Sequence, residues 1–226
     1  MKYTEQHKLA DVINDHFQTI LVVSRFGIPL GFGDKTVKSV CQEYGVDSKT
    51  FLVVLNYMAN GDLSGLENVS VMAMVKFLRL SHQYYLEFFF PQLRERLKNA
   101  LSDANDKLGE MIVSFFDNFV STVRKHLNHE EVAVLCNIER MCNNEKLESD
   151  FSIERYTQKH EQIDHTIQDL KNIIIKYYPD NGNVNSISSV LYDIFSCEVD
   201  LKMHCDIEDN IFAPVVEMFE KQQMEA

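Results

Sequence analysis

The sequence predicts an all-α protein, an up-down-up-down four-helix bundle preceded by a small helical amino-terminal domain. The 226 residues include only 8 glycines and 4 prolines. Beyond about residue 70, glycine occurs only at Gly109 and Gly182. Apolar residues recur there every three or four positions over four long stretches, which is the period of an amphipathic helix. The short connections between these stretches favour antiparallel neighbours, as in a helix bundle.

Residues 1–62 are expected to form the small domain, and residues 63–226 the bundle. The segment FGIPLGFGDK (26–35) interrupts the first helical region, because three glycines and a proline exclude a continuous helix. The segment MANGDLSGLENVS (58–70) is the expected linker. Every candidate ligand named below follows that linker, so the first 60 residues are expected to be dispensable for metal binding.

The segment DKTVKSVCQEYGVDSKTFLVVLNYM (34–58) has the pattern of a helix-turn-helix with Gly45 at the turn. DNA binding is therefore one interpretation of this segment. Its second helix offers Lys49 as its only basic residue and is otherwise apolar, which favours a packing surface. Phe51, Val54 and Leu55 are candidates there for contact with a partner or a second subunit.

Each of the four long helices is predicted to carry a histidine on its apolar stripe. The ranges and histidines are 70–99 with His82, 107–142 with His126, 152–178 with His160, and 186–222 with His204. Two of these histidines have a glutamate four residues later, Glu130 and Glu208, which shares their helix face. His129 lies about 60° around its helix from His126 and is a candidate for a supporting hydrogen bond.

Such a set of residues indicates a metal site. An ionised carboxylate is costly to bury unless a cation or hydrogen bonds compensate it. Imidazole and carboxylate ligands without thiolate suit iron, manganese or zinc, and two carboxylates able to bridge favour a pair of ions. The predicted ligands are His82, His126, Glu130, His160, His204 and Glu208. The alternative is a set of buried glutamate–histidine pairs with adjusted protonation and no metal.

Composition narrows the possible partners and location. The formal net charge of −12 and the lack of a basic patch argue against nucleic acid and anionic membranes as partners. No window approaches 18 consecutive apolar residues, and the start MKYTEQHKLADVIN lacks the features of a signal peptide. Five cysteines without CxxC spacing are interpreted as structural thiols. A cytoplasmic location is therefore expected.

Four segments carry a resemblance to a known family. HLNHEE (126–131), QKHEQIDHTIQDLKNI (158–173) and HCDIEDNIFAP (204–214) resemble the successive motifs of a hemerythrin-like domain. Together with SHQYYLEFFFPQL (81–93), they are most similar to the RIC family of di-iron proteins, which repair iron–sulfur clusters.

The resemblance extends over residues 9–47, which are similar in layout to the ScdA-like domain that precedes the bundle in that family. The family's Cys-Cys pair is absent from Gly27–Gly33, and a further family histidine is absent from LKNALSDANDKLGE (97–110).

The resemblance implies a non-haem di-iron protein involved in repairing iron–sulfur clusters damaged by nitrosative or oxidative stress, with damaged iron–sulfur proteins as partners. The alternative is a hemerythrin-like protein that binds or senses oxygen or nitric oxide. A homodimer is possible under both interpretations. Whether the protein is an enzyme is left open, and no catalytic residue is predicted.

Overall fold

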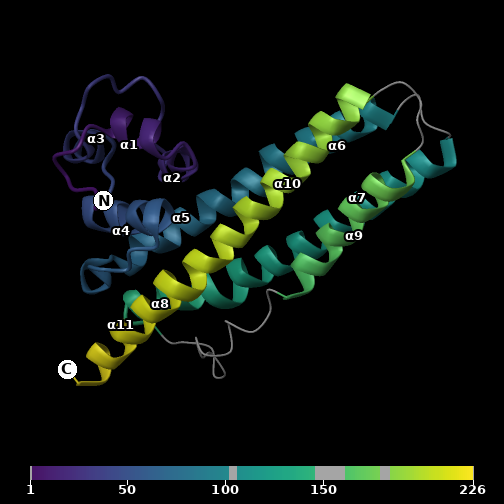
Figure 1. The fold of residues 1–226 in the computed structure, drawn as a ribbon. Helices are drawn as coiled ribbons and strands as arrows, with labels where there is room; N and C mark the ends of the chain where they lie inside the picture. Colours follow the sequence, from purple (N-terminus) through teal and green to yellow (C-terminus); the bar gives the residue numbers. More distant parts are fainter. Residues whose placement is uncertain (1, 102–105, 146–160, 179–183, 226) are drawn as a thin grey trace. The chain divides into compact units, whose positions relative to one another are not determined.

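The computed structural model describes residues 2–101, 106–145, 161–178 and 184–225, without the side chains of 106, 161–165, 224 and 225. The described residues are predominantly helical, which confirms the all-α class (Figure 1). They fall into two compact units. One contains the described residues among 1–81, 133–157 and 206–226, and the other contains those among 82–132 and 158–205. The expected domain boundary near residue 62 stays a prediction.

All four predicted long helices are present in the described part of the chain, and three of them change pitch at a π-helical turn. The elements are α5 (Val71–Gln83), η2 (Tyr84–Phe89) and α6 (Phe90–Leu101); α7 (Asp106–His129), η3 (Glu130–Leu135) and α8 (Cys136–Cys142); α9 (Glu161–Tyr177); and α10 (Val184–Ile207), η5 (Glu208–Phe212) and α11 (Ala213–Glu225). The expected beginning of the third helix, at 152–160, lies outside the described residues.

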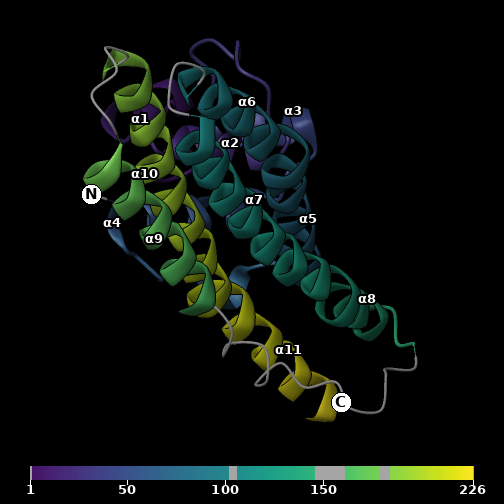
Figure 2. The same cartoon turned by 90° about the vertical axis from the view of Figure 1, so that its right-hand side faces the viewer.

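The unit that contains 82–132 and 158–205 is built around one apolar core. Buried residues from α6, α7, α9 and α10 meet there, including Phe90, Phe119, Leu170 and Ile194. These four helices run alongside one another in Figures 1 and 2. At one end of the core, the Tyr178 hydroxyl, just after α9, donates a hydrogen bond of 3.3 Å to the carbonyl of Ala100 in α6.

Ion pairs join neighbouring helices of this unit outside the core. The Arg94 guanidinium binds the Asp117 carboxylate through Nε and Nη2, at 2.6 and 2.8 Å, which connects α6 to α7. The pair between Lys171 and Glu198 connects α9 to α10. The core and these lateral contacts together hold the four helices in a fixed rotation about their axes. This rotation determines which side chains of each helix point inward.

The other unit contains five short helical elements before α5. They are α1 (Leu9–Asp15), α2 (Thr19–Arg25), α3 (Val37–Tyr44), α4 (Ser48–Asn60) and the 3-10 turn η1 (Leu66–Asn68). Phe26 joins them to α5, since its ring centroid lies 5.2 Å from that of Phe51 in α4 and 4.8 Å from that of Phe77 in α5. Because α4 continues to Asn60, the connection to α5 is shorter than the predicted linker.

The segment that resembles a helix-turn-helix has a structural explanation. Gly45 ends α3 in the left-handed conformation, with φ of 63°, and the Asp47 side chain accepts a hydrogen bond of 2.7 Å from the Thr50 amide at the start of α4. Phe51, Val54 and Leu55 are each 0% exposed. Their expected role as a contact surface is therefore wrong, because they form part of this unit's own core.

None of the described helices is both long enough and apolar enough to span a membrane.

Candidate metal centre

Four of the predicted ligands meet in a compact cluster. His82, Glu130, His204 and Glu208 each contribute one nitrogen or oxygen atom, and these atoms all lie within 4.8 Å of one another. All four side chains are buried. Because α10 continues without a break into η5, Glu208 follows His204 by one helical turn on the same face.

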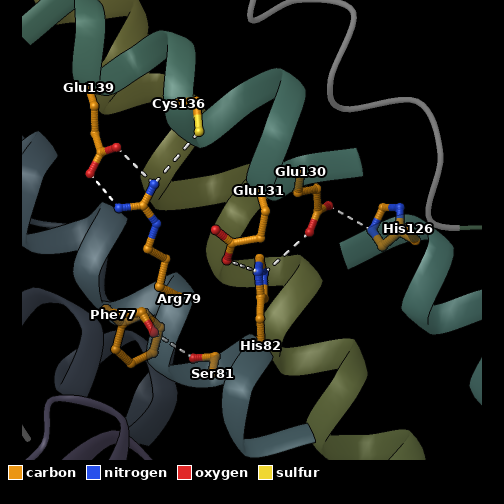
Figure 3. A network of polar contacts seen from close by, with 9 residues as sticks. All are labelled: Phe77, Arg79, Ser81, His82, His126, Glu130, Glu131, Cys136 and Glu139. Atoms are coloured by element: carbon orange, nitrogen blue, oxygen red, sulfur yellow. Dashed lines mark hydrogen bonds and ion pairs between the residues drawn. The ribbon is translucent and has the colours of Figure 1, made fainter. Parts of the chain in front are cut away.

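The Glu130 carboxylate contacts two histidines from different helices. Its Oε2 lies 3.3 Å from Nε2 of His82, and its Oε1 lies 2.7 Å from Nε2 of His126. Figure 3 shows Glu130 between the two imidazole rings. One carboxylate that presents a separate oxygen to each of two imidazoles has the form of a bridging ligand.

Glu131 supports the other side of the His82 ring. Its Oε1 lies 2.8 Å from Nδ1 of His82. When Nδ1–H donates this hydrogen bond, Nε2 of the neutral ring carries a lone pair that faces the Glu130 carboxylate. Two electron-pair donors then face one another, and a bound cation or a second ring proton would satisfy both.

A π-helical turn accompanies each ligand helix described at the cluster. The turn η2 begins two residues after His82, η3 begins at Glu130 itself, and η5 begins at Glu208 itself. A π-turn inserts one residue relative to α-helical pitch and is frequent at functional sites. A π-turn therefore occurs at or just after a clustered residue in each of three helices. This repetition indicates that the backbone is adapted to place these side chains.

Aromatic residues cover one side of the cluster. The Tyr85 ring is buried and meets the His204 ring edge-to-face, with 5.7 Å between centroids. The His82 and His204 rings are also edge-to-face, at 5.2 Å. Tyr85 in turn stacks on Phe90, so this side of the site is apolar.

The other sequence-predicted residues have different positions. The His126 side chain, at 10% exposure, touches Glu130 and lies at the edge of the cluster. His160 lies outside the described residues. His129, the candidate for a supporting hydrogen bond, is exposed, and Glu131 is the residue that contacts Nδ1 of His82. Cys205, next to His204 in the sequence, is half-buried and is not part of the cluster.

Glu131 is the functional residue that the sequence reasoning missed. The only local signal was its position directly after Glu130. Its partner His82 is 49 residues away, so helical periodicity within one segment could not reveal the contact.

The donor set suits a metal ion. Two imidazoles and two carboxylates, without a thiolate, match iron, manganese or zinc. Burial removes water as a competing ligand and makes uncompensated carboxylates costly, so a cation matches both the chemistry and the location. These features define a helical protein with a histidine–carboxylate metal site.

Comparison with protein families places the chain more narrowly. The model of the Hemerythrin HHE cation-binding domain matches residues 73–216. The match covers more than half of the chain, which therefore belongs to this family, and the domain binds metal cations. Comparisons with curated proteins and with solved structures found no match.

Proposed function

We propose that the protein is a non-haem di-iron protein that takes part in repairing iron–sulfur clusters damaged by nitric oxide or oxidants. The observation that supports two ions is the Glu130 carboxylate, which directs one oxygen towards His82 and the other towards His126. The proposed ligands are His82, His126, Glu130, His160, His204 and Glu208. Manganese or zinc would fit the same donors.

Iron bound at this site would supply redox chemistry and an exchangeable coordination position. The chain's own residues prepare the site for it. Glu131 orients His82 through Nδ1, and the aromatic side formed by Tyr85 and Phe90 limits access of water. Glu130 contacts both the His82 and the His126 ring. Loss or gain of one ion would therefore change the surroundings of both histidines.

The proposed repair role follows from the resemblance of the motifs at 81–93, 126–131, 158–173 and 204–214 to the RIC family. The corresponding partners are damaged iron–sulfur proteins, and neither nucleic acid nor a membrane is proposed as a partner. The proposed location is the cytoplasm. None of the five cysteines, all of which lie within the described residues, forms a disulfide, which fits a reducing compartment.

Reversible binding or sensing of oxygen or nitric oxide is a second candidate function. The observation in its favour is the apolar side of the cluster, because the buried rings of Tyr85 and Phe90 provide surroundings compatible with an uncharged diatomic molecule.

One experiment tests the proposal and separates the two functions. The protein is purified without oxygen, its iron content and optical spectrum are measured, and it is mixed with an iron–sulfur dehydratase inactivated by nitric oxide. We expect reactivation by the iron-loaded protein and none by the Glu130→Ala variant. Equal reactivation by both would contradict the proposed role of the site. Slow autoxidation with reversible oxygen binding and no reactivation would favour the second function.

A further inference from the structure

A continuous series of aromatic contacts leads from the candidate metal centre towards the protein surface. The buried Tyr85 ring lies edge-to-face with the His204 ring, with 5.7 Å between centroids. The half-buried Tyr84 ring meets the Tyr85 ring at 5.5 Å, again edge-to-face. Tyr84 also lies 5.7 Å from the ring of Phe88, which is 53% exposed. Two tyrosines therefore connect a buried candidate ligand with the surface, within one compact unit of the protein.

The residue types in this series suggest more than packing. An apolar cover over the cluster needs only an aromatic ring, and the same helix uses phenylalanine for that purpose at Phe88, Phe89 and Phe90. Tyr84 and Tyr85 carry in addition a phenolic hydroxyl. A phenol can lose one electron together with its hydroxyl proton, which leaves a delocalised radical that a reductant can restore. Phenylalanine has no such reaction, so the two tyrosines are the members of the series that can carry charge.

We propose that Tyr85 and Tyr84 form a relay that carries oxidising equivalents away from the metal centre when hydrogen peroxide reacts there. The inference rests on the proposed function, because it requires iron at the cluster. Reduction of the peroxide O–O bond to one hydroxide ion and one water molecule takes two electrons and one proton. One electron comes from ferrous iron. The Tyr85 phenol supplies the other electron and the proton, and becomes a tyrosyl radical.

Two further exchanges complete the relay. In the first, Tyr85 regains an electron and a proton while Tyr84 loses one of each. In the second, a small thiol from the medium donates a hydrogen atom to the half-buried Tyr84, and pairs of thiyl radicals combine to disulfides. Both phenols are then restored, one thiol is oxidised for each tyrosyl radical, and no oxygen atom is added to the protein.

Other oxidisable groups near the cluster define the alternatives. Without the relay, the imidazole rings of His82 and His204, which lie 5.2 Å apart, would be the groups exposed to the oxidant. Cys205 is half-buried and follows His204 in the sequence, but its sulfur is not among the clustered donor atoms. Because Tyr85 contacts the His204 ring itself, we expect tyrosine oxidation rather than histidine or cysteine oxidation.

Iron-loaded full-length protein tests the relay. It is prepared without oxygen, its iron content is measured, and it is mixed with stoichiometric hydrogen peroxide and a hydroxyl-radical scavenger before freezing. We expect a tyrosyl radical in the electron paramagnetic resonance spectrum, and none from metal-free protein. Tyr85→Phe should lose this signal and gain oxygen-added His82 or His204 in peptide mass spectrometry. Tyr192→Phe, at an exposed position of α10, is the matched control and should behave as the wild type.

Tyr84→Phe distinguishes a relay from a single buried radical, and it keeps the proposal testable if Tyr85→Phe binds less iron. The radical should then stay on Tyr85, and a small thiol should quench it more slowly than in the wild type. Cys205→Ser should leave the signal unchanged.

Two results would overturn the relay in protein that holds iron. One is the absence of a tyrosyl radical from the wild type. The other is equal quenching by thiol in the wild type and Tyr84→Phe. Failure of the wild type to bind iron would instead contradict the proposed metal centre.

Discussion

At the scale of single residues, Glu130 connects two histidines of the proposed metal centre. It is fully buried and touches both His82 and His126, whereas the neighbouring His129 is exposed. We predict that Glu130→Ala loses most of the bound iron, because both histidines lose their common carboxylate. His129→Ala should keep the wild-type content. Elemental analysis after anaerobic reconstitution measures both, and equal losses would contradict the ligand assignment.

Glu131 has a different proposed role, since it contacts His82, a proposed ligand, and is not itself in the proposed ligand set. Its contact with Nδ1 of His82 fixes the ring orientation that directs Nε2 towards Glu130. We predict that Glu131→Ala lowers metal affinity by about 10- to 100-fold, the usual cost of removing such a support. Competition with a chelator measures the affinity. Glu110→Ala, at an exposed position of α7, is the control, and an equal effect of the two changes would exclude a specific role.

Cys41 illustrates how burial controls thiol chemistry. Burial, followed by the nearby charges of Asp47 and Glu5, raises the pKa of this thiol to about 12. A raised pKa favours the protonated form, so at pH 8 only about one thiol in 10⁴ is ionised. We predict that native wild-type protein and Cys41→Ser show the same number of fast-reacting thiols with a disulfide reagent. The wild type should show one more than the variant after denaturation, and a fast-reacting Cys41 in the native protein would contradict this.

At the scale of elements, the ends of the helices follow from local signals. Gly45 stops α3 with φ of 63°, and no other side chain would meet a Cβ added there within 4 Å. We predict that Gly45→Ala lowers the free energy of unfolding by about 1–2 kcal/mol, entirely through backbone strain. Gln42→Ala, on the exposed side of α3, should change it by less than about 0.5 kcal/mol. Denaturant titration compares the two, and equal effects would argue against strain at Gly45.

The sequence predicts the described parts of the long helices within a few residues, but it does not predict their π-turns. A period of 3.6 residues assigns Phe89 to the buried stripe of the first helix. The structure buries Phe90 and leaves Phe89 half-buried, because η2 adds a residue to the turn after His82. The clustering of His82, Glu130, His204 and Glu208 was predictable because each lies at or before the π-turn of its helix, where the periodicity still holds.

Polar contacts between helices that are distant in the sequence could not be predicted either. The bidentate pair of Arg79 with Glu139, at 2.5 and 2.8 Å, joins α5 to α8 across 60 residues (Figure 3). Nothing in either segment specifies the other, since charged residues on helix surfaces are common. Apolar stripes define the faces of helices, whereas the pairing of polar residues depends on which faces meet.

At the scale of the whole molecule, the helices before Gly61 share a core with α5. Phe26 lies between Phe51 and Phe77, and Gly27 lies 3.7 Å, measured from an added Cβ, from the Leu80 side chain. This packing was not evident from the sequence, because glycine-rich segments separate the residues that meet in it. It also explains why the apolar residues of α4 are buried within the chain.

The last prediction concerns removal of residues 1–63. All six proposed ligands remain in a chain that begins at Ser64, so its metal content should equal that of the full chain. Its thermal midpoint should fall by about 10 °C, because the truncation removes the Phe26 side chain that packs on Phe77, and removing one buried phenylalanine side chain costs about 3–5 kcal/mol. Phe26→Ala in the full chain is the matched variant and should lower the midpoint in the same direction with its metal retained. If the shortened chain remained helical but lost its metal, a residue such as His7 or His16 would have to contribute to the site, and the proposed ligand set would be incomplete.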